Sequence, residues 1–414
     1  MLYDLVIIGA GLAGFSSALV AVERGKKTVI LARGLGNLYS SSGYIDLLGY
    51  YPATERKPLL SLLEGLNRLI DEKPAHPYSL VGTDMIKDAF SSFLSISEVM
   101  GLPYGGSTYK NVIMPTAVGS LVPTTLFPKT AERDVFEAEK IVVAGIRELI
   151  DFFPAYTAGN LEIALERKID FYWVNIGINV HRELNSYDIA LALEEKEIRD
   201  RLLKQLKPIS KGSLLLIPAV LGVKRWKEVI SHMEEELECK VLEIPTFPPS
   251  VMGYRLAETL LNYLKSKGVE IITGYSVDYF KGDKDVEEVA ITMSNGRLKK
   301  FKGKSYILAT GGILGEGLQV YPQEIKETIF SLPVISPEPP SREDFFNLEG
   351  QPFSSTGVFV NNSLQPLDRT GKVIFNNLFV SGATLGGYDP FLEKSGNGVA
   401  LSTGYKAALM ALKG

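Results

Sequence analysis

The 414-residue sequence has only one cysteine, Cys239, and three histidines, His76, His181 and His232. A single cysteine cannot form an internal disulfide, and it leaves no cysteine set for an iron–sulfur cluster or a zinc ribbon. The histidines are scattered, without the spacing of metal ligands. We therefore expect no metal site in this chain, and any cluster that works with it would have to belong to a partner.

The chain also lacks a strong excess of charge and any apolar run long enough to span a bilayer. Its net charge of -4 gives no electrostatic argument for nucleic acid binding. The apolar N-terminal stretch could be mistaken for a signal peptide, but no basic residues precede it and three glycines interrupt it. Because 45% of the residues are hydrophobic and 22% are charged, we expect an ordinary globular protein of the cytoplasm without a membrane span.

What the chain does have is a glycine-rich turn between two apolar segments at its start. The turn carries Gly9, Gly11 and Gly14 at the spacing G-x-G-x-x-G, between a strand pattern over 3–8 and a helix expected over 15–24. Such glycines allow a tight turn, the close approach of a pyrophosphate and the packing of the helix on the strand. The helix would point its partly positive N-terminus at the pyrophosphate. This context indicates a dinucleotide site, and a plain connecting turn is the alternative.

One element of the dinucleotide pattern is missing. About 20 residues after the glycines, such folds usually have an acidic residue that binds the ribose 2′-hydroxyl, whereas the second strand here ends at Ala32 and Arg33. The arginine could bind a phosphate, stack on an adenine or be solvated. The identity of the cofactor is therefore open at this point.

Further glycine-rich segments follow other predicted strands and open the final helix. Because the carboxyl ends of parallel strands meet at one edge of a sheet, we expect these segments to gather around a ligand there. The start of the final helix would suit the pyrimidine end of a flavin, whose negative charge the helix dipole would stabilise. The cofactor-binding residues predicted in this way are Gly9, Ala10, Gly11, Leu12, Ala13, Gly14, Ala32, Arg33, Ser41, Ser42, Gly43, Ala309, Thr310, Gly311, Gly382, Gly386, Gly387, Gly396, Asn397 and Gly398.

The middle third of the chain alternates strand and helix patterns but has no glycine fingerprint for phosphate. We therefore predict an α/β protein in which a Rossmann-like FAD/NAD(P)-binding domain carries an inserted α/β substrate or cap domain. The expected boundaries are 1–100 for the first part of the flavin-binding domain, 101–239 for the inserted domain and 240–414 for the second part. Within the second part, an Asn295-Gly296 pair between strand patterns predicts a hairpin.

Four blocks of sequence are more specific than the glycine motif: residues 41–48 (SSGYIDLL), 75–80 (AHPYSL), 248–251 (PPSV) and 385–390 (LGGYDP). Together with the FAD-domain pattern, they resemble the B subunits of anaerobic glycerol-3-phosphate dehydrogenases. These are flavoproteins with an FAD domain of the fumarate-reductase or glutathione-reductase type. The resemblance extends over nearly the whole chain.

The resemblance implies an enzyme subunit that takes part in oxidising sn-glycerol 3-phosphate to dihydroxyacetone phosphate, with quinone as electron acceptor, in anaerobic respiration on glycerol. It implies a complex with a catalytic A subunit and an iron–sulfur, membrane-anchoring C subunit. The chain would then lie in the cytoplasm at the inner face of the cell membrane, held there by its partner. The cofactor would be FAD by the fold and FMN by the family.

The sequence offers only two candidates for a substrate-side role. His76 lies between two prolines in a rigid loop, and Arg255 lies on an amphipathic helix. A local hydrogen-bonding role for His76 and a structural role for Arg255 are the alternatives. Two other functions also stay open: a non-catalytic Rossmann-like scaffold that docks the catalytic subunit, and a stand-alone flavin reductase for another small acid.

Overall fold

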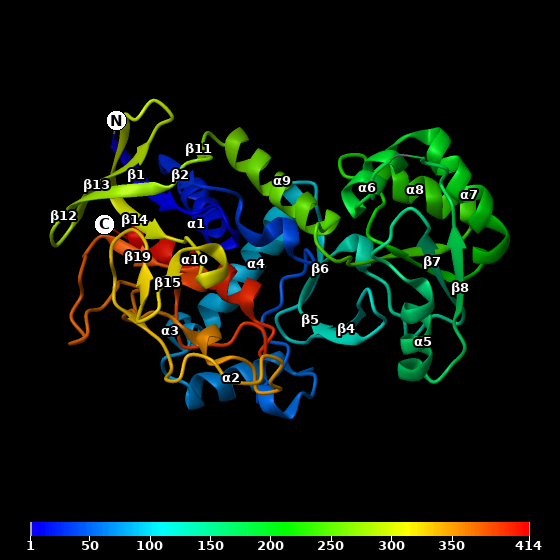
Figure 1. Ribbon diagram of the computed structural model, residues 1–414, viewed down its shortest axis with the longest axis horizontal. Helices are drawn as coiled ribbons and strands as arrows, with labels where there is room; N and C mark the ends of the chain where they lie inside the picture. Colours follow the sequence, from blue (N-terminus) through cyan, green and yellow to red (C-terminus); the bar gives the residue numbers. More distant parts are fainter. Residues whose placement is uncertain (1, 180, 414) are drawn as a thin grey trace.

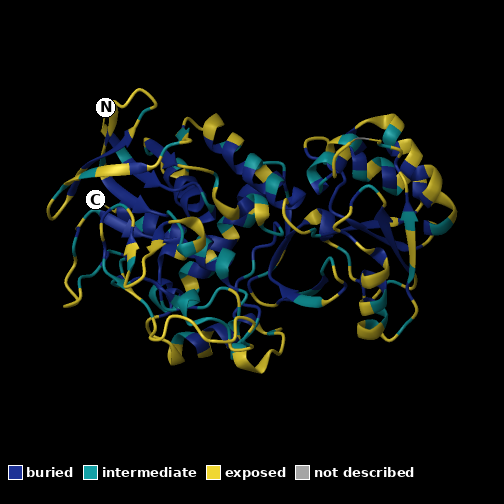
Figure 2. Ribbon diagram, viewed as in Figure 1, coloured by how far each residue is buried: buried dark blue, intermediate teal, exposed yellow. Residues whose placement is uncertain are grey.

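The computed structural model describes residues 2–179 and 181–413, which form two lobes joined side by side (Figure 1). The large lobe contains the first and the last segments of the chain, and the small lobe contains most of the middle third. Each lobe has its own buried core around a sheet, shown by the dark strands in Figure 2. None of the helices in the described part of the chain is both long and apolar enough to cross a membrane.

A parallel sheet forms the centre of the large lobe, with its strands in the order β11-β2-β1-β14-β19. A hairpin is added to the first half of β14, where β13 and β12 continue the sheet in antiparallel fashion. The strands of this sheet are β1 (Leu2–Ile8), β2 (Thr28–Ala32), β11 (Glu270–Thr273), β12 (Val277–Gly282), β13 (Val286–Thr292), β14 (Leu298–Leu308) and β19 (Leu378–Val380).

Helices cover the large sheet, and two of them pack on each other unusually closely. A Cβ atom at Gly404 of α10 would lie 2.3 Å from the Ala13 carbonyl oxygen of α1, and the Ser17 hydroxyl donates to the Gly404 carbonyl at 2.8 Å. Small residues are therefore needed at this crossing. The helices of this lobe are α1 (Leu12–Glu23), α2 (Leu62–Glu72), α3 (Pro77–Val81), α4 (Thr83–Val99), α9 (Val251–Ser266) and α10 (Gly396–Ala411).

The small lobe has a parallel sheet of four strands in the order β10-β9-β7-β8. Its outermost strand β10 lies beyond the expected boundary at residue 239, so the inserted unit continues further than the sequence pattern indicated. The elements of this lobe are β7 (Ile141–Ile146), α5 (Pro154–Leu165), β8 (Asp170–Val174), α6 (Ser186–Glu194), α7 (Lys196–Ser210), β9 (Leu214–Pro218), α8 (Trp226–Leu237) and β10 (Lys240–Ile244).

Short hairpins join the two lobes. They contribute to a small third cluster of apolar side chains that includes Tyr44, Phe127 and Met252. The junction strands are β3 (Tyr104–Gly106), β4 (Val112–Pro115), β5 (Leu121–Thr124) and β6 (Leu126–Pro128). Short strands elsewhere are β15 (Leu318–Val320), β16 (Ile325–Glu327), β17 (Val334–Ile335) and β18 (Gly357–Val358), and 3₁₀ turns span Gly36–Ser40, Ala53–Glu55, Lys129–Ala131, Ile313–Gly315, Pro352–Ser355 and Gly382–Thr384.

Candidate functional site

A cleft of about 1490 Å³ opens at the carboxyl edge of the large sheet. The strand register explains its position, because Ile8 of β1 pairs with Leu31 of β2 and with Leu308 of β14, which pairs with Val380 of β19. The four strands therefore end at one level, and the loops that follow them surround the cleft. This is the edge at which open parallel sheets bind ligands.

The first glycine turn forms one wall of the cleft. Gly9 has a φ of +118°, and a Cβ there would lie 2.1 Å from the Ala309 carbonyl oxygen, so β1 and β14 approach too closely for any side chain. Gly14 packs in the same way, since its Cβ would lie 2.0 Å from the Gly9 carbonyl oxygen. At Gly11 an added Cβ would meet no atom within 4 Å, and this residue lines the cleft. Gly9 and Gly14 therefore permit close backbone packing in the turn, whereas Gly11 leaves open space in the cleft.

Helix α1 presents free backbone amides to that space. Its N-cap residue is Gly11, which has no side chain to accept hydrogen bonds from the first turn, and no acidic side chain lies in that turn. The first amides of a helix have no partner within the helix. Unpaired amides and the positive end of the helix dipole together form an anion site suited to a phosphate group.

The far edge of the cleft carries an ion pair that the sequence did not reveal. Arg33, after β2, pairs with Glu316, which follows the 3₁₀ turn after β14, and both residues line the cleft. An acidic side chain from a segment 283 residues away thus lies next to Arg33 at the end of β2. No local pattern could have predicted this pair.

Polar groups from two other loops face the cleft nearer its centre. Ser41 lines it, with its hydroxyl donating to the Leu38 carbonyl at 2.9 Å. Thr310 also lines it, and its Oγ1 is covered from solvent without a hydrogen-bond partner in the described residues. Because a buried hydroxyl without a partner is costly, Thr310 is a position where a bound polar ligand would be stabilised.

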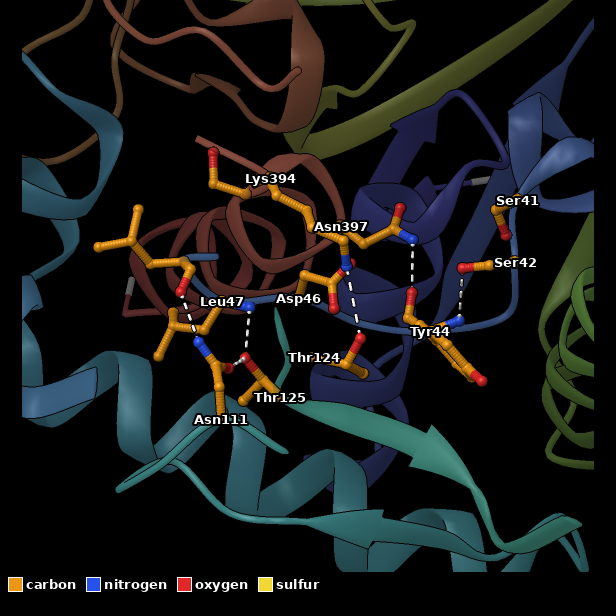
Figure 3. Close-up of polar contacts among 12 residues, drawn as sticks. Ser41, Ser42, Tyr44, Asp46, Leu47, Asn111, Thr124, Thr125, Lys394 and Asn397 are labelled. Atoms are coloured by element: carbon orange, nitrogen blue, oxygen red, sulfur yellow. Dashed lines mark hydrogen bonds and ion pairs between the residues drawn. The ribbon is translucent and has the colours of Figure 1, made fainter. Parts of the chain in front are cut away.

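The start of α10 also lines the cleft, and its Asn397 side chain points toward Tyr44 (Figure 3). Gly396 and Asn397 line it, and the Asn397 side chain donates to the Tyr44 carbonyl at 2.8 Å. Gly398 instead packs against the Asp46 carbonyl oxygen, which an added Cβ would approach to 2.5 Å. The loop at 41–46 and the first turn of α10 are therefore held together.

Most of the predicted cofactor-binding residues come together around the cleft, and a minority pack behind it. Gly43 lies against Met252, and Gly386 and Gly387 lie against Gly357 and Ala75. These glycines permit close backbone packing rather than ligand approach. The predicted residues that do not line the cleft are Gly14, Ser42, Gly43, Gly386, Gly387 and Gly398.

His76 does not line the cleft, because it is fully buried behind it in a polar network. Its Nδ1 accepts from the Tyr78 amide at 3.0 Å, so its Nε2 carries the proton that is shared with Glu393 at 3.0 Å. The other Glu393 oxygen accepts from Lys73 at 3.1 Å. Burial works to raise the pKa of Glu393, but the His76 hydrogen bond and the Lys73 charge outweigh it and lower this pKa.

Tyr388 connects this network to the cleft. Its ring lies edge-on to the His76 ring with centroids 5.7 Å apart, and it lines the cleft itself. Burial raises the pKa of its phenol, so Tyr388 is a neutral hydroxyl. His76 therefore contacts the cleft-lining Tyr388 but does not line the cleft itself.

Arg255 is buried at the boundary between the lobes, away from the cleft. Its guanidinium binds both carboxylate oxygens of Glu243 on β10, at 2.6 and 3.0 Å, and donates twice to the Gly222 carbonyl, at 2.6 and 2.9 Å. All of its partners come from the small lobe, whereas Arg255 lies on α9. This bidentate pair ties the two lobes together.

Comparison with known proteins gives a consistent result over the whole chain. Residues 4–399 match the family model of the FAD binding domain. The chain is 30% identical over 437 aligned residues to a protein of Aliivibrio fischeri named as the B subunit of anaerobic glycerol-3-phosphate dehydrogenase, covering 99% of this chain and 95% of the relative. A protein of Vibrio cholerae serotype O1 with the same name is 31% identical over 438 residues, covering 98% and 96%.

Among solved structures, the chain is similar to the open conformation of a flavocytochrome c3 fumarate reductase. The TM-score is 0.46 at 11% identity, with 100% of this chain and 78% of that chain covered.

Proposed function

The chain belongs to the FAD-binding family that contains the B subunits of anaerobic glycerol-3-phosphate dehydrogenases, and on that premise we propose that it is the flavin-carrying subunit of such an enzyme. The enzyme oxidises sn-glycerol 3-phosphate to dihydroxyacetone phosphate and passes the electrons to quinone. The observation that carries this proposal is the identity of about 30% over nearly the full length of both chains. The cleft of about 1490 Å³ also lies at the sheet edge where folds of this type bind dinucleotides.

The residues around the cleft fit FAD. Open space at Gly11 lies beside the free amides of α1, where the pyrophosphate would be held. The unpartnered hydroxyl of Thr310 and the side chain of Asn397 would contact polar parts of the cofactor. Arg33 and Glu316 would hold the adenosine end.

When bound, the flavin supplies an acceptor for the hydride that leaves the alcohol carbon of the substrate. The chain's own residues would bind the cofactor and the substrate and orient them. The helix dipole of α10 would favour negative charge on a cofactor group near Gly396, and the neutral Tyr388 would offer a hydrogen-bond donor to the cleft. The loops that follow four strands hold these groups around the cleft.

The partners we propose are a catalytic A subunit and an iron–sulfur, membrane-anchoring C subunit. Their support is the designation of the relatives as B subunits in their names, together with the match over whole chains. In this arrangement the chain lies at the inner face of the cell membrane through its partner. Direct contact of this chain with the substrate is part of the proposal.

Two measurements test the proposed function. Flavin extracted from the purified chain should have the mass of FAD and be present at close to one molecule per chain. Glycerol 3-phosphate should then reduce a dye acceptor in the presence of the chain, faster when the catalytic partner is added. Loss of this turnover together with full activity on an unrelated small acid would favour a stand-alone reductase, and a chain that takes up no flavin would favour a scaffold.

A further inference from the structure

A charged pair, Asp46 and Lys394, lies between the start of α10 and the end of β5 (Figure 3). The Lys394 ammonium donates to the Asp46 carboxylate and lies 3.4 Å from the Thr124 hydroxyl on β5. The Asp46 carbonyl accepts from the Gly398 amide at 3.0 Å, and the adjacent Asn397 lines the cleft. The pair thus lies beside the first turn of α10, between the large lobe and the junction hairpins.

Only one oxygen of the Asp46 carboxylate has a hydrogen-bond partner among the described residues. Its Oδ2 binds Lys394, whereas its Oδ1 is covered from solvent and has no hydrogen-bond partner among the described residues. A covered carboxylate oxygen without a partner costs free energy. Lys394 has three N–H donors, and its contacts with Asp46 and Thr124 use two of them. One acceptor and one donor are therefore left side by side.

An acceptor beside a donor matches a hydroxyl group, which donates its proton to one and accepts from the other. The corresponding ketone oxygen can only accept, so it would keep the lysine contact and lose the carboxylate contact. The two groups would therefore bind both redox forms of a secondary alcohol. The side chains of Lys394 and Asp46 keep exposures of 24% and 14%, so the pair is not sealed into the core.

We propose that Asp46 and Lys394 are the catalytic pair that binds and deprotonates the secondary alcohol of the substrate. This inference rests on the proposed function. The alcohol carbon loses its hydride to the oxidised flavin, the hydroxyl proton passes to Asp46 Oδ1, and the carbon–oxygen double bond forms. Lys394 stabilises the negative charge that develops on that oxygen. Oδ1 is covered from solvent in this structure, so the substrate hydroxyl would have to displace the groups that cover it.

The test uses the flavin-loaded full-length chain and four variants. Asp46→Asn removes the base and keeps the shape, Lys394→Met removes the donor, and Lys394→Arg keeps a cation. The matched control is Lys304→Met, which breaks the exposed pair of Lys304 with Asp4 (2.8 Å) that does not line the cleft. The readouts are the dihydroxyacetone phosphate-induced change in flavin absorbance, which reports binding, and the rate of flavin reduction by glycerol 3-phosphate.

Asp46→Asn should keep its flavin and bind the ketone as the wild type does, while its flavin is reduced roughly 100-fold more slowly or worse. Lys394→Met should bind the ketone roughly tenfold more weakly, Lys394→Arg should retain most of the affinity, and Lys304→Met should match the wild type. If Asp46→Asn fails to fold, the difference in ketone affinity between Lys394→Met and Lys394→Arg decides whether this pair binds the substrate.

Wild-type reduction rates in Asp46→Asn, or equal ketone affinity in both Lys394 variants and the wild type, would overturn the assignment of this pair while leaving the proposed function intact. A wild-type chain that carries flavin but responds to neither ligand would overturn substrate oxidation by this chain, and this inference with it.

Discussion

Gly9 and Gly11 lie in the same turn, yet a side chain would meet very different surroundings at each. At Gly9 it would collide with the backbone of Ala309, which directly follows β14, whereas at Gly11 it would project into the open cleft beside the first amides of α1. Substitution at Gly9 therefore tests the fold. Substitution at Gly11 tests the phosphate site.

We expect Gly11→Asn to fold and to lose flavin. Asparagine is a favoured N-cap residue, so the helix start is not weakened, but its side chain would occupy the amides that a phosphate needs. The ratio of bound flavin to protein should fall at least tenfold, with the melting temperature of the flavin-free chain changed by only a few degrees. Gly159→Ala, at an open position on α5, is the control. Full flavin content in Gly11→Asn would contradict this assignment of the phosphate site.

Glu316 is the residue that we expect to distinguish FAD from FMN. Both partners of the Arg33–Glu316 pair are 63% exposed, so the pair itself contributes little to stability. If the Glu316 carboxylate takes the place of the acidic residue missing after β2, Glu316→Gln should weaken FAD binding roughly tenfold and leave FMN binding unchanged. Titration of the flavin-free chain with each flavin measures this. Glu287→Gln, in an exposed pair with Lys281, should change neither affinity.

At the scale of elements, the segments with a strong local signal were predicted from the sequence. The strand–turn–helix start and the hairpin at Asn295-Gly296 are confirmed, because periodicity and turn chemistry act through neighbouring residues. Strand β10 was missed. Two residues of this strand (Lys240–Ile244), Lys240 and Glu243, are charged. The strand is recognised only by its pairing with β9.

The pairs that join distant elements could not be predicted. Arg33 meets Glu316, Asp46 meets Lys394 and Arg255 meets Glu243 only because the sheet order and the junction between the lobes bring them together. A single sequence carries no signal for such contacts. For this reason the candidate cofactor loops could be named from the sequence, whereas the charged pair of Asp46 and Lys394 could not.

The segment that leads into α10 should make the chain sensitive to acid. The pKa of Glu393 is lowered in the folded state from its ordinary value of 4.5. A lowered pKa contributes stability that is fully present above that ordinary value and is lost as the pH falls through the folded-state pKa. The free energy of unfolding should therefore decline below pH about 4.5, where this carboxylate begins to take up a proton in the unfolded chain.

Glu393→Gln should remove this contribution. At neutral pH the variant should be less stable by about 3 kcal/mol, because Lys73 and His76 lose their charged partner, and the difference from the wild type should shrink as the pH falls below about 4. Denaturant unfolding at several pH values measures both effects. Glu236→Gln, in an exposed pair with Lys207, is the control. A constant difference across the pH range would rule out the proposed linkage.

At the scale of the whole molecule, the two lobes have separate cores (Figures 1 and 2). The described residues that line the cleft all belong to the large lobe. The lobes are connected by the junction hairpins, by the Arg255–Glu243 pair and by the Lys394–Thr124 contact. Few of these contacts involve the centre of either sheet. Ligand binding in the cleft should therefore stabilise the large lobe directly, and the small lobe only through the contacts that connect the two lobes.

Hydrogen exchange of the flavin-free and flavin-loaded chain measures this difference. At a free flavin concentration of about 100 Kd, binding stabilises the folded site by about 2.7 kcal/mol, so amides that open together with the cleft should exchange roughly 100-fold more slowly. We expect this slowing in β1, β14, α1 and α10 and little change in β7 and β9. Gly11→Asn with the same flavin added should show no slowing. Equal slowing of both sheets would instead mean that the junction couples the lobes into one cooperative unit.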